Sequence, residues 1–331
     1  MRTVLVTGGA GFIGSHLVDQ LLEGGAAVRV LDNFSTGSLG NLHSAAKRHS
    51  RGGGSHLEVI IGDIRDRELL RKALRNVKYV FHLAALPATA GSVIDSGDVH
   101  AVNVEGTLNV LHGALTEGVW RVVLASCSSV YGPGAPVPVS EDAPLRPSSL
   151  FAASKVAAET YGLAFHVRHQ LDTVILRYFT VYGPRQRPAA GGALTPRLVE
   201  AVRQRRPFGE EDDRSAEDFV AVDDVVAATL AAARAPRVAG RVINVGSGQM
   251  VAISDVLAIL AGLLETPVAK ADGSKAAAAP HRICASMALA ADLLDFTPKV
   301  SLIAGLARMI RLLDASGEPE PVGLAPAGRT S

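Results

Sequence analysis

The stretch Thr7–Gly14, which reads TGGAGFIG, decides the fold of this chain. It directly follows the apolar run Val4–Val6 and opens an amphipathic pattern that predicts a helix over residues 12–23. Gly8, Gly11 and Gly14 have the spacing G-x-x-G-x-x-G, so the backbone can turn tightly and approach a pyrophosphate at the positive end of the helix. The stretch therefore predicts a strand, a phosphate-binding turn and a helix. A βα turn without a ligand is the alternative.

Asp32 ends the next apolar run, in VRVLDN, about 20 residues after the glycines. A carboxylate at this distance can bind the diol of a ribose, and it repels the 2′-phosphate of NADP. NAD is therefore the predicted cofactor. Asp63 and Ile64 follow the third apolar run, in VIIGDIRD, and we expect them to contact the adenine. For Asp63, capping of the helix that follows is the alternative.

Short apolar runs alternate with helical patterns through the first part of the chain. Strands separated by helices require right-handed crossovers, which place the strands in a parallel sheet with helices on both faces. The sequence thus predicts an α/β fold of the Rossmann type, with a doubly wound parallel sheet. The expected strands are residues 3–7, 28–31, 57–61, 79–83, 122–125 and 173–177, and the expected helices are residues 12–23, 66–75, 98–117 and 152–169.

The pattern changes after Val181, where proline, glycine and charge interrupt residues 183–218. Strands near residues 219–222 and 242–245, and helices near residues 224–234, 254–264 and 301–314, are too few for a second domain of the same kind. We expect an NAD-binding domain over residues 1–180 and a smaller C-terminal substrate-binding lobe over residues 181–315, with chain exchange between them left open. Residues 44–55 and the tail 316–331 are expected to be flexible.

Charge and cysteine content exclude several classes of protein. The 33 basic residues balance 32 acidic ones, so no net field attracts nucleic acid or an anionic membrane. The two cysteines, Cys127 and Cys284, cannot form a disulfide framework, and neither shows the close spacing of a metal site. No apolar run reaches the roughly 18 residues of a membrane span, and the first residues lack a secretory pattern. A cytoplasmic protein without a metal is expected.

Further motifs resemble the extended short-chain dehydrogenase/reductase family, and within it the NAD-dependent nucleotide-sugar epimerases and dehydratases. In chain order they are TGGAGFIG (7–14), GDIRD (62–66), HLAA (82–85), NVEGTLNVL (103–111), SSVYG (128–132), AASKVAAE (152–159), RYFTVYGP (177–184), DFVAVDDVV (218–226) and INVGSG (243–248). The segment RYFTVYGPRQRP is most similar to UDP-glucuronate 4-epimerases, with Thr180 where UDP-glucose 4-epimerases usually carry asparagine.

The resemblance implies a set of cofactor contacts, carried over by position. NAD would contact Gly8, Gly11, Phe12, Ile13, Gly14, Asp32, Asn33, Asp63, Ile64, Leu83, Ala84, Ala85, Asn103, Lys155 and Tyr178. Among these, Asn103 would support the sheet and a nearby loop, and Lys155 would bind the nicotinamide ribose. His82, Tyr131, Tyr178 and Tyr182 are expected to have structural roles.

The resemblance also implies where a UDP-sugar would bind. Ser126, Cys127 and Ser128 would lie beside the sugar, and Thr180, Arg187, Arg197, Arg214 and Arg282 along the nucleotide diphosphate, for which arginine is well suited. Glu217 replaces an arginine that relatives carry before the strand DFVAV, and Arg214 is expected to compensate.

One departure from the family concerns the chemistry itself. The family pattern is Tyr-x-x-x-Lys, in which a tyrosine held by the lysine exchanges the proton of the sugar 4-hydroxyl; here the frame reads Phe151-Ala-Ala-Ser-Lys155. Losing that group should reduce the rate by about 10² to 10⁴. Cys127, as a thiolate beside Lys155, is the first expected substitute, ahead of Ser126, Ser128, Ser129 and an ordered water, although Cys127 can equally be a buried filler.

Three functions therefore remain open. The first is an active epimerase of a UDP-hexuronate or UDP-hexose, the second a catalytically silent subunit that binds NAD and a sugar nucleotide, and the third a reductase of a ketosugar. Elimination is disfavoured, because Ser128-Ser129 stands where the family's dehydratases carry an acid and a base. The resemblance further implies a homodimer through helices 98–117 and 152–169, whose apolar residues (Val102, Leu108, Leu111, Val156, Tyr161, Phe165) can alternatively pack on the sheet.

Overall fold

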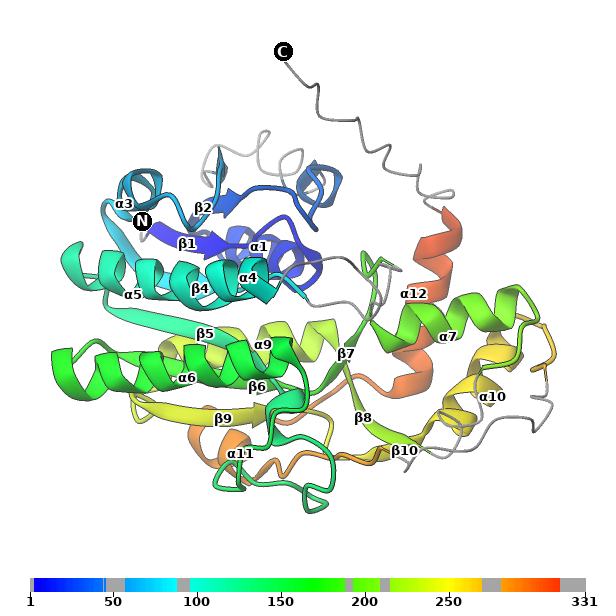
Figure 1. The fold of residues 1–331 in the computed structure, drawn as a ribbon. Helices are drawn as coiled ribbons and strands as arrows, with labels where there is room; N and C mark the ends of the chain where they lie inside the picture. The colour runs from blue at the N-terminus through cyan, green and yellow to red at the C-terminus, as the bar shows by residue number, and fades with distance from the viewer. Residues whose placement is uncertain are drawn as a thin grey trace, which may run out of the picture.

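Seven parallel strands form the larger of two sheets in the computed structural model, which describes residues 3–43, 45, 57–87, 96–187, 193–208, 215–269 and 281–315. The strand order is β3-β2-β1-β4-β5-β6-β9 (Figure 1). These strands are β1 (Thr3–Thr7), β2 (Ala27–Asp32), β3 (Leu57–Ile61), β4 (Val77–His82), β5 (Arg121–Cys127), β6 (Thr173–Tyr178) and β9 (Arg241–Val245). The order reverses direction between β1 and β4, as in a doubly wound sheet, so the predicted fold class is confirmed.

Helices cover both faces of this sheet, and each face has its own apolar core. One face packs against α1 (Phe12–Glu23), α9 (Val222–Arg234) and α11 (Ala288–Leu294). The other packs against α3 (Arg67–Leu74), α5 (Gly106–Thr116) and α6 (Leu150–His169). A short helix, α4 (Ser96–His100), leads through a π-helical turn (Ala101–Glu105) into α5. Among the described residues, no helix combines the length and apolar character needed to cross a membrane.

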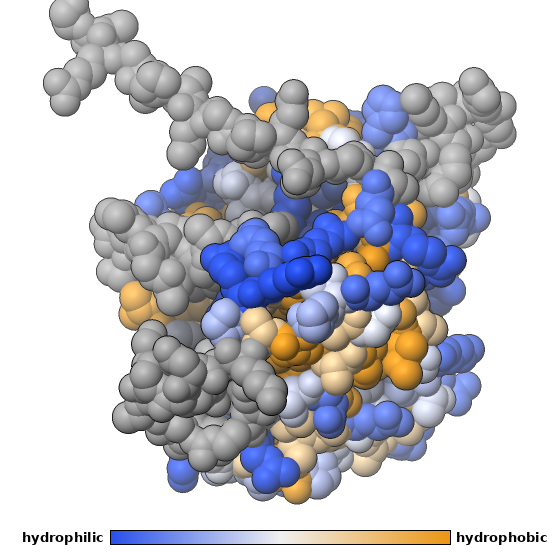
Figure 2. Space-filling view, turned by 90° about the vertical axis from the view of Figure 1, so that its right-hand side faces the viewer, coloured by the Kyte–Doolittle hydropathy of each residue, from blue (hydrophilic) through white to orange (hydrophobic). Residues whose placement is uncertain are grey.

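A smaller lobe is built on the three-stranded sheet β10-β8-β7. Its strands are β7 (Thr180–Tyr182), β8 (Ala216–Ala221) and β10 (Met250–Ala252), and its helices are α7 (Leu194–Arg203), α10 (Ile253–Leu263) and α12 (Leu302–Ala315). Apolar residues of these elements form a separate core. Figure 2 faces the side of the molecule that carries α7, α10 and α12, where hydrophilic residues border apolar ones. An ion pair between Arg203 and Asp314 links α7 to α12 on this lobe.

The second half of the chain differs from the prediction in the place of one strand, β9, and in several elements that were not predicted. β9 was expected in the smaller lobe, but it pairs with β6 and forms an edge of the large sheet, so the chain crosses between the lobes after residue 180. The segment read as interrupted contains α7, because Pro196 lies in the first turn of that helix, where a missing N–H costs nothing. β7, β10 and α11 are too short to give a clear periodic pattern.

The two helical faces predicted for a dimer are only partly free. Leu111 is fully buried and Phe165 is 6% exposed, both in the core that α5 and α6 share with the sheet. For these two residues the alternative, packing on the protein's own sheet, is correct. Tyr161 on α6 is 40% exposed and points away from that core. The homodimer stays a prediction.

Candidate active site

A cavity of about 440 Å³ opens at the carboxyl ends of the central strands, where ligands bind in doubly wound sheets. It begins at the glycine-rich turn after β1 and reaches the first turns of α6. Its lining includes most of the residues predicted for NAD: Gly8, Gly11, Phe12, Ile13, Gly14, Asp32, Asn33, Asp63, Ile64, Leu83, Ala84, Ala85, Lys155 and Tyr178. Ser126, Cys127 and Phe151 line the same cavity, so the residues predicted for cofactor binding and those predicted for catalysis share one site.

The turn after β1 leaves no room for side chains. Gly8 has φ +70°, and a Cβ there would lie 2.7 Å from the backbone nitrogen of Ala84. A Cβ on Gly14 would collide with the carbonyl oxygen of Gly8. Only glycine fits at these two positions, and the tight turn they allow places the N-terminus of α1 at the cavity, which fits the pyrophosphate of NAD.

Asp32 is placed by the same turn. One carboxylate oxygen accepts the backbone N–H of Ala10 at 2.9 Å, and the other accepts that of Phe34 at 2.8 Å. The side chain is fixed at the end of β2 and lines the cavity, as the ribose end of NAD requires. The glycine-rich turn and the Asp32 carboxylate, which can accept hydrogen bonds from a diol, therefore fit the pyrophosphate and the ribose of the predicted cofactor.

Asp63 does not cap a helix. Asp66 is the N-cap of α3 and accepts the N–H of Leu69 at 3.0 Å, so that alternative for Asp63 is wrong. Asp63 instead binds Arg65 and accepts a hydrogen bond from the Asn33 amide at 3.0 Å. The bond from Arg65 lowers the pKa of Asp63, which keeps the carboxylate charged at the cavity wall.

His82 and Asn103 form hydrogen bonds with other protein groups around the cavity and have structural roles. The His82 ring lies 2.7 Å from the Thr7 hydroxyl and 2.9 Å from that of Thr107. Burial, helped by the charge of Lys155, lowers the pKa of His82 to about 3, so the ring is neutral. Asn103, in the π-helical turn, accepts the N–H of Leu86 and donates to the Ser154 hydroxyl, which joins the loop after β4 to α6.

Lys155 and Phe151 lie one turn apart at the start of α6. Lys155 is 8% exposed, and its Nζ donates to the carbonyl oxygen of Ala125 at 3.0 Å. The same Nζ lies 5.7 Å from the centroid of the Phe151 ring. Burial lowers the pKa of Lys155, although the charges of Cys127 and Glu159 act in the opposite direction.

Cys127 does not have the environment of a thiolate. Its Sγ lies 2.7 Å from the Ser129 hydroxyl, and burial raises the pKa of the thiol despite the neighbouring Lys155. Burial therefore opposes the predicted activation of the Cys127 thiol by Lys155, and a catalytic role for Cys127 stays a prediction. Ser128 begins the 3₁₀ turn after β5 and is not among the described residues that line the cavity.

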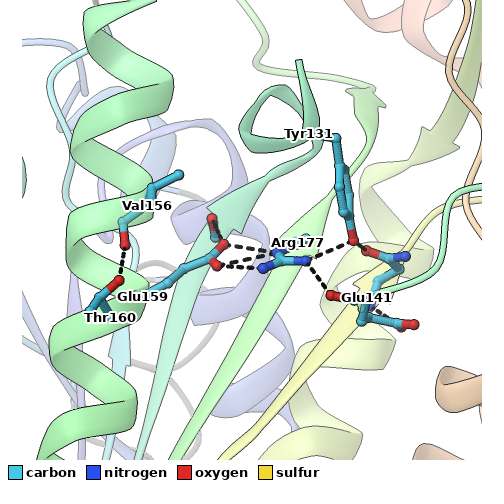
Figure 3. A network of polar contacts seen from close by, with 8 residues as sticks. Tyr131, Glu141, Val156, Glu159, Thr160 and Arg177 are labelled. Carbon is cyan, nitrogen blue, oxygen red and sulfur yellow. Dashed lines mark hydrogen bonds and ion pairs between the residues drawn. The ribbon is translucent and has the colours of Figure 1, made fainter. Parts of the chain in front are cut away.

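The sequence interpretation missed a buried charged network behind Ser126 (Figure 3). Ser126 donates to Glu159 at 2.5 Å, and Arg177 binds both oxygens of that carboxylate, the closest contact being 2.7 Å. Arg177 also donates to the Tyr131 hydroxyl at 2.9 Å and to the carbonyl oxygen of Glu141 at 3.0 Å. Glu159 stands in AASKVAAE, four residues after Lys155, and that helical spacing was the available signal.

The residues predicted for the diphosphate are not gathered in the cavity. Thr180 is half-buried and donates to Glu217, whose other oxygen lies 3.7 Å from His281. Arg187, Arg197 and Arg282 are exposed and are not among its described lining, and Arg197 stacks on Phe208 at 5.2 Å. Arg214 lies outside the described residues. A diphosphate-binding role for these side chains stays a prediction.

Comparison with known proteins agrees with this geometry. Residues 4–246 match the model of the NAD dependent epimerase/dehydratase family. A UDP-glucose 4-epimerase from Mycolicibacterium smegmatis is 36% identical over 94% of this chain and 97% of that protein. The structure of a UDP-glucuronic acid 4-epimerase from Bacillus cereus, with UDP-glucuronic acid and NAD, has a TM-score of 0.84 at 31% identity over 95% of this chain and 100% of that chain. The same figures hold for a Tyr-to-Phe mutant of that enzyme with NAD and a 4-deoxy-4-fluoro sugar nucleotide.

Proposed function

Because this chain belongs to the NAD dependent epimerase/dehydratase family, we propose that it is an NAD-dependent sugar-nucleotide 4-epimerase that acts on a UDP-hexuronate or UDP-hexose. The observation that carries the proposal is the single cavity that runs from the glycine-rich turn to Lys155. It joins a dinucleotide-binding end to an end lined by Ser126, Cys127 and Phe151, where the sugar would lie beside the nicotinamide.

The residues of this chain divide the work along the cavity. The backbone of the Gly8–Gly14 turn binds the pyrophosphate, Asp32 binds the adenosine ribose, and Lys155 binds the nicotinamide ribose. NAD, when bound, supplies the acceptor and donor of hydride for C4 of the sugar. Leu83, Ala84 and Phe151 line the cavity and give it apolar walls.

Binding of both ligands is compatible with a phenylalanine at position 151. A Tyr-to-Phe mutant of the B. cereus enzyme was crystallised with NAD and a sugar nucleotide, which supports this compatibility. The elimination chemistry of dehydratases is less well supported here, because Ser128 is set back from the described cavity lining and Ser129 is bonded to Cys127.

A screen of sugar nucleotides tests the proposal. Purified protein, supplemented with NAD, is incubated with UDP-glucuronate, UDP-glucose and UDP-N-acetylglucosamine, and the products are separated by chromatography. We expect the 4-epimer of at least one substrate to form, with no net change in NADH. Substrate carrying deuterium at C4 should keep its label in the product, because the same hydride leaves and returns.

Two other outcomes would contradict the proposal. If no sugar is epimerised and no reduced nicotinamide is detected, while NAD and UDP-sugar both bind, the protein is a silent binding subunit. Net consumption of NADH with a 4-ketosugar, without epimerisation, would identify a reductase instead.

A further inference from the structure

Tyr178, Tyr131 and Tyr182 each have a hydroxyl that is hydrogen-bonded to another protein group. The Tyr178 ring lines the cavity, but its hydroxyl lies 2.8 Å from that of Thr229, and burial raises its pKa. Tyr131 donates to the Asn244 side chain at 2.6 Å, and Tyr182 donates to the carbonyl oxygen of Ser301 at 3.4 Å. None of the three can replace the hydroxyl that Phe151 lacks.

Ser126 and Glu159 are also poor candidates for the base. Ser126 donates its proton to Glu159, so its hydrogen points away from the cavity. Glu159 is 3% exposed, and Arg177 donates hydrogen bonds to both of its oxygens, so the carboxylate is already engaged on the side away from the cavity. In the network of Figure 3, Arg177 is thus the ion-pair partner of Glu159, the carboxylate that follows Lys155 by four residues on α6.

Lys155 is consequently a buried amine without a carboxylate of its own among the described residues. Its direct partner is the neutral carbonyl of Ala125, and it faces the ring of Phe151. Glu159, four residues along the same helix, is held by Arg177 on β6. From β4, the neutral His82 faces it, and from β5, the protonated thiol of Cys127. Burial also lowers the pKa of Lys155, which favours the uncharged amine.

We infer that Lys155 is itself the acid and base of the reaction, in place of the tyrosine that position 151 does not supply. The inference rests on the proposed function. In the forward step the O–H bond of the 4-hydroxyl breaks and an N–H bond forms on the neutral Nζ, while the electron pair of the C4–H bond leaves as hydride to the oxidised nicotinamide. In the return step, hydride attacks the other face of the C4 carbonyl and the ammonium returns the proton to oxygen, so atoms and electrons balance.

The first test measures the titration of Lys155 and does not depend on turnover. Full-length protein loaded with NAD and labelled with ¹³C at lysine Cε is titrated by NMR, and the Lys155 signal is assigned through Lys155→Arg. We expect Lys155 to lose its proton at a lower pH than the exposed Lys72, and this titration to coincide with the rise of kcat/KM with pH. A Lys155 that stays protonated throughout the pH range of activity would overturn the inference.

The second test separates proton transfer from binding of the cofactor. Lys155→Ala should lose at least about 10² in kcat, and added primary alkylamines should restore rate to an extent that rises with amine basicity. The control Lys72→Ala should keep the wild-type rate. A variant that loses NAD affinity but shows no basicity-dependent rescue would assign Lys155 a binding role only. Absence of turnover by the wild type would instead refute the proposed function, and the inference with it.

Discussion

Phe151 differs from the tyrosine of the family pattern by one atom, the phenol oxygen that would exchange the substrate proton. The ring occupies the cavity wall beside Lys155, and no described tyrosine near the cavity can supply the hydroxyl from another position. The residue does not disturb the surrounding contacts: Ser154 of the next turn still donates to the Phe151 carbonyl and receives a bond from Asn103. The substitution therefore changes the chemistry of the site more than its shape.

Restoring the hydroxyl should increase activity. For Phe151→Tyr we expect kcat to rise by about 10² to 10⁴ on the native sugar nucleotide, because a phenol held by Lys155 is a better-placed acid and base than the amine alone. Steady-state kinetics of the variant measure this. Phe165→Tyr, a change of the same kind in the core under α6, serves as control and should leave kcat unchanged. An unaltered rate in Phe151→Tyr would mean that the substrate hydroxyl lies elsewhere in the cavity.

Helix α6 supplies several of the side chains around the active site, because they recur at the spacing of one helical turn. Phe151, Ser154, Lys155 and Glu159 recur at spacings of three and four residues, so all lie on the face toward the sheet. The helix begins at Leu150, with the Ser149 hydroxyl accepting the N–H of Ala152 at 3.1 Å. The site thus depends on where this one helix starts.

Removing the cap should loosen that start. Ser149→Ala leaves the N–H of Ala152 without its side-chain acceptor and should lower the free energy of unfolding by about 1 kcal/mol. Chemical denaturation measures the loss. Ser149→Asp keeps an acceptor and should remain within about 0.5 kcal/mol of the wild type. Equal losses in both variants would show that the hydroxyl does not act as a cap.

At the scale of the whole molecule, the chain connects the two lobes by leaving the large sheet after β6 and returning to it at β9. Asp218 on β8 is fully buried and accepts the backbone N–H groups of Ser247, Gly248 and Ala285. This carboxylate ties the turn after β9 to the small sheet. The small lobe, with α7, α10 and α12, therefore lies beside the large sheet in one continuous body (Figure 1).

His82 makes the stability of this body depend on pH. Its pKa is about 3 in the fold against an ordinary value of 6.5, so between these values the unfolded chain binds the additional proton. Stability should therefore fall as pH drops through this window, with His82 alone contributing up to about 1.4 kcal/mol per pH unit. Denaturation at several pH values measures the slope. His82→Gln should reduce it, whereas the exposed His100→Gln should not; equal slopes in all three proteins would contradict this origin.

Much of the site was readable in the sequence because its signals are local. The glycine turn, Asp32 and the helix over residues 12–23 lie within one βαβ unit, and the structure has α1 at those residues. Glu159 and Arg177 carried no comparable signal. Charged residues are expected at the surface, and only the packing of α6 on β6 buries Glu159 against Arg177, which stands 18 residues later in the sequence.

The sequence by itself determined the doubly wound sheet, the cofactor-binding turn and the absence of a hydroxyl at Phe151, because each follows from residue type and short-range spacing. Only the tertiary structure decided the state of the groups around that absence. Burial keeps the thiol of Cys127 protonated, Arg177 engages Glu159, and Lys155 is left with a carbonyl for a partner. These properties depend on desolvation and on which charges meet across the sheet, and neither is encoded in any one stretch of the chain.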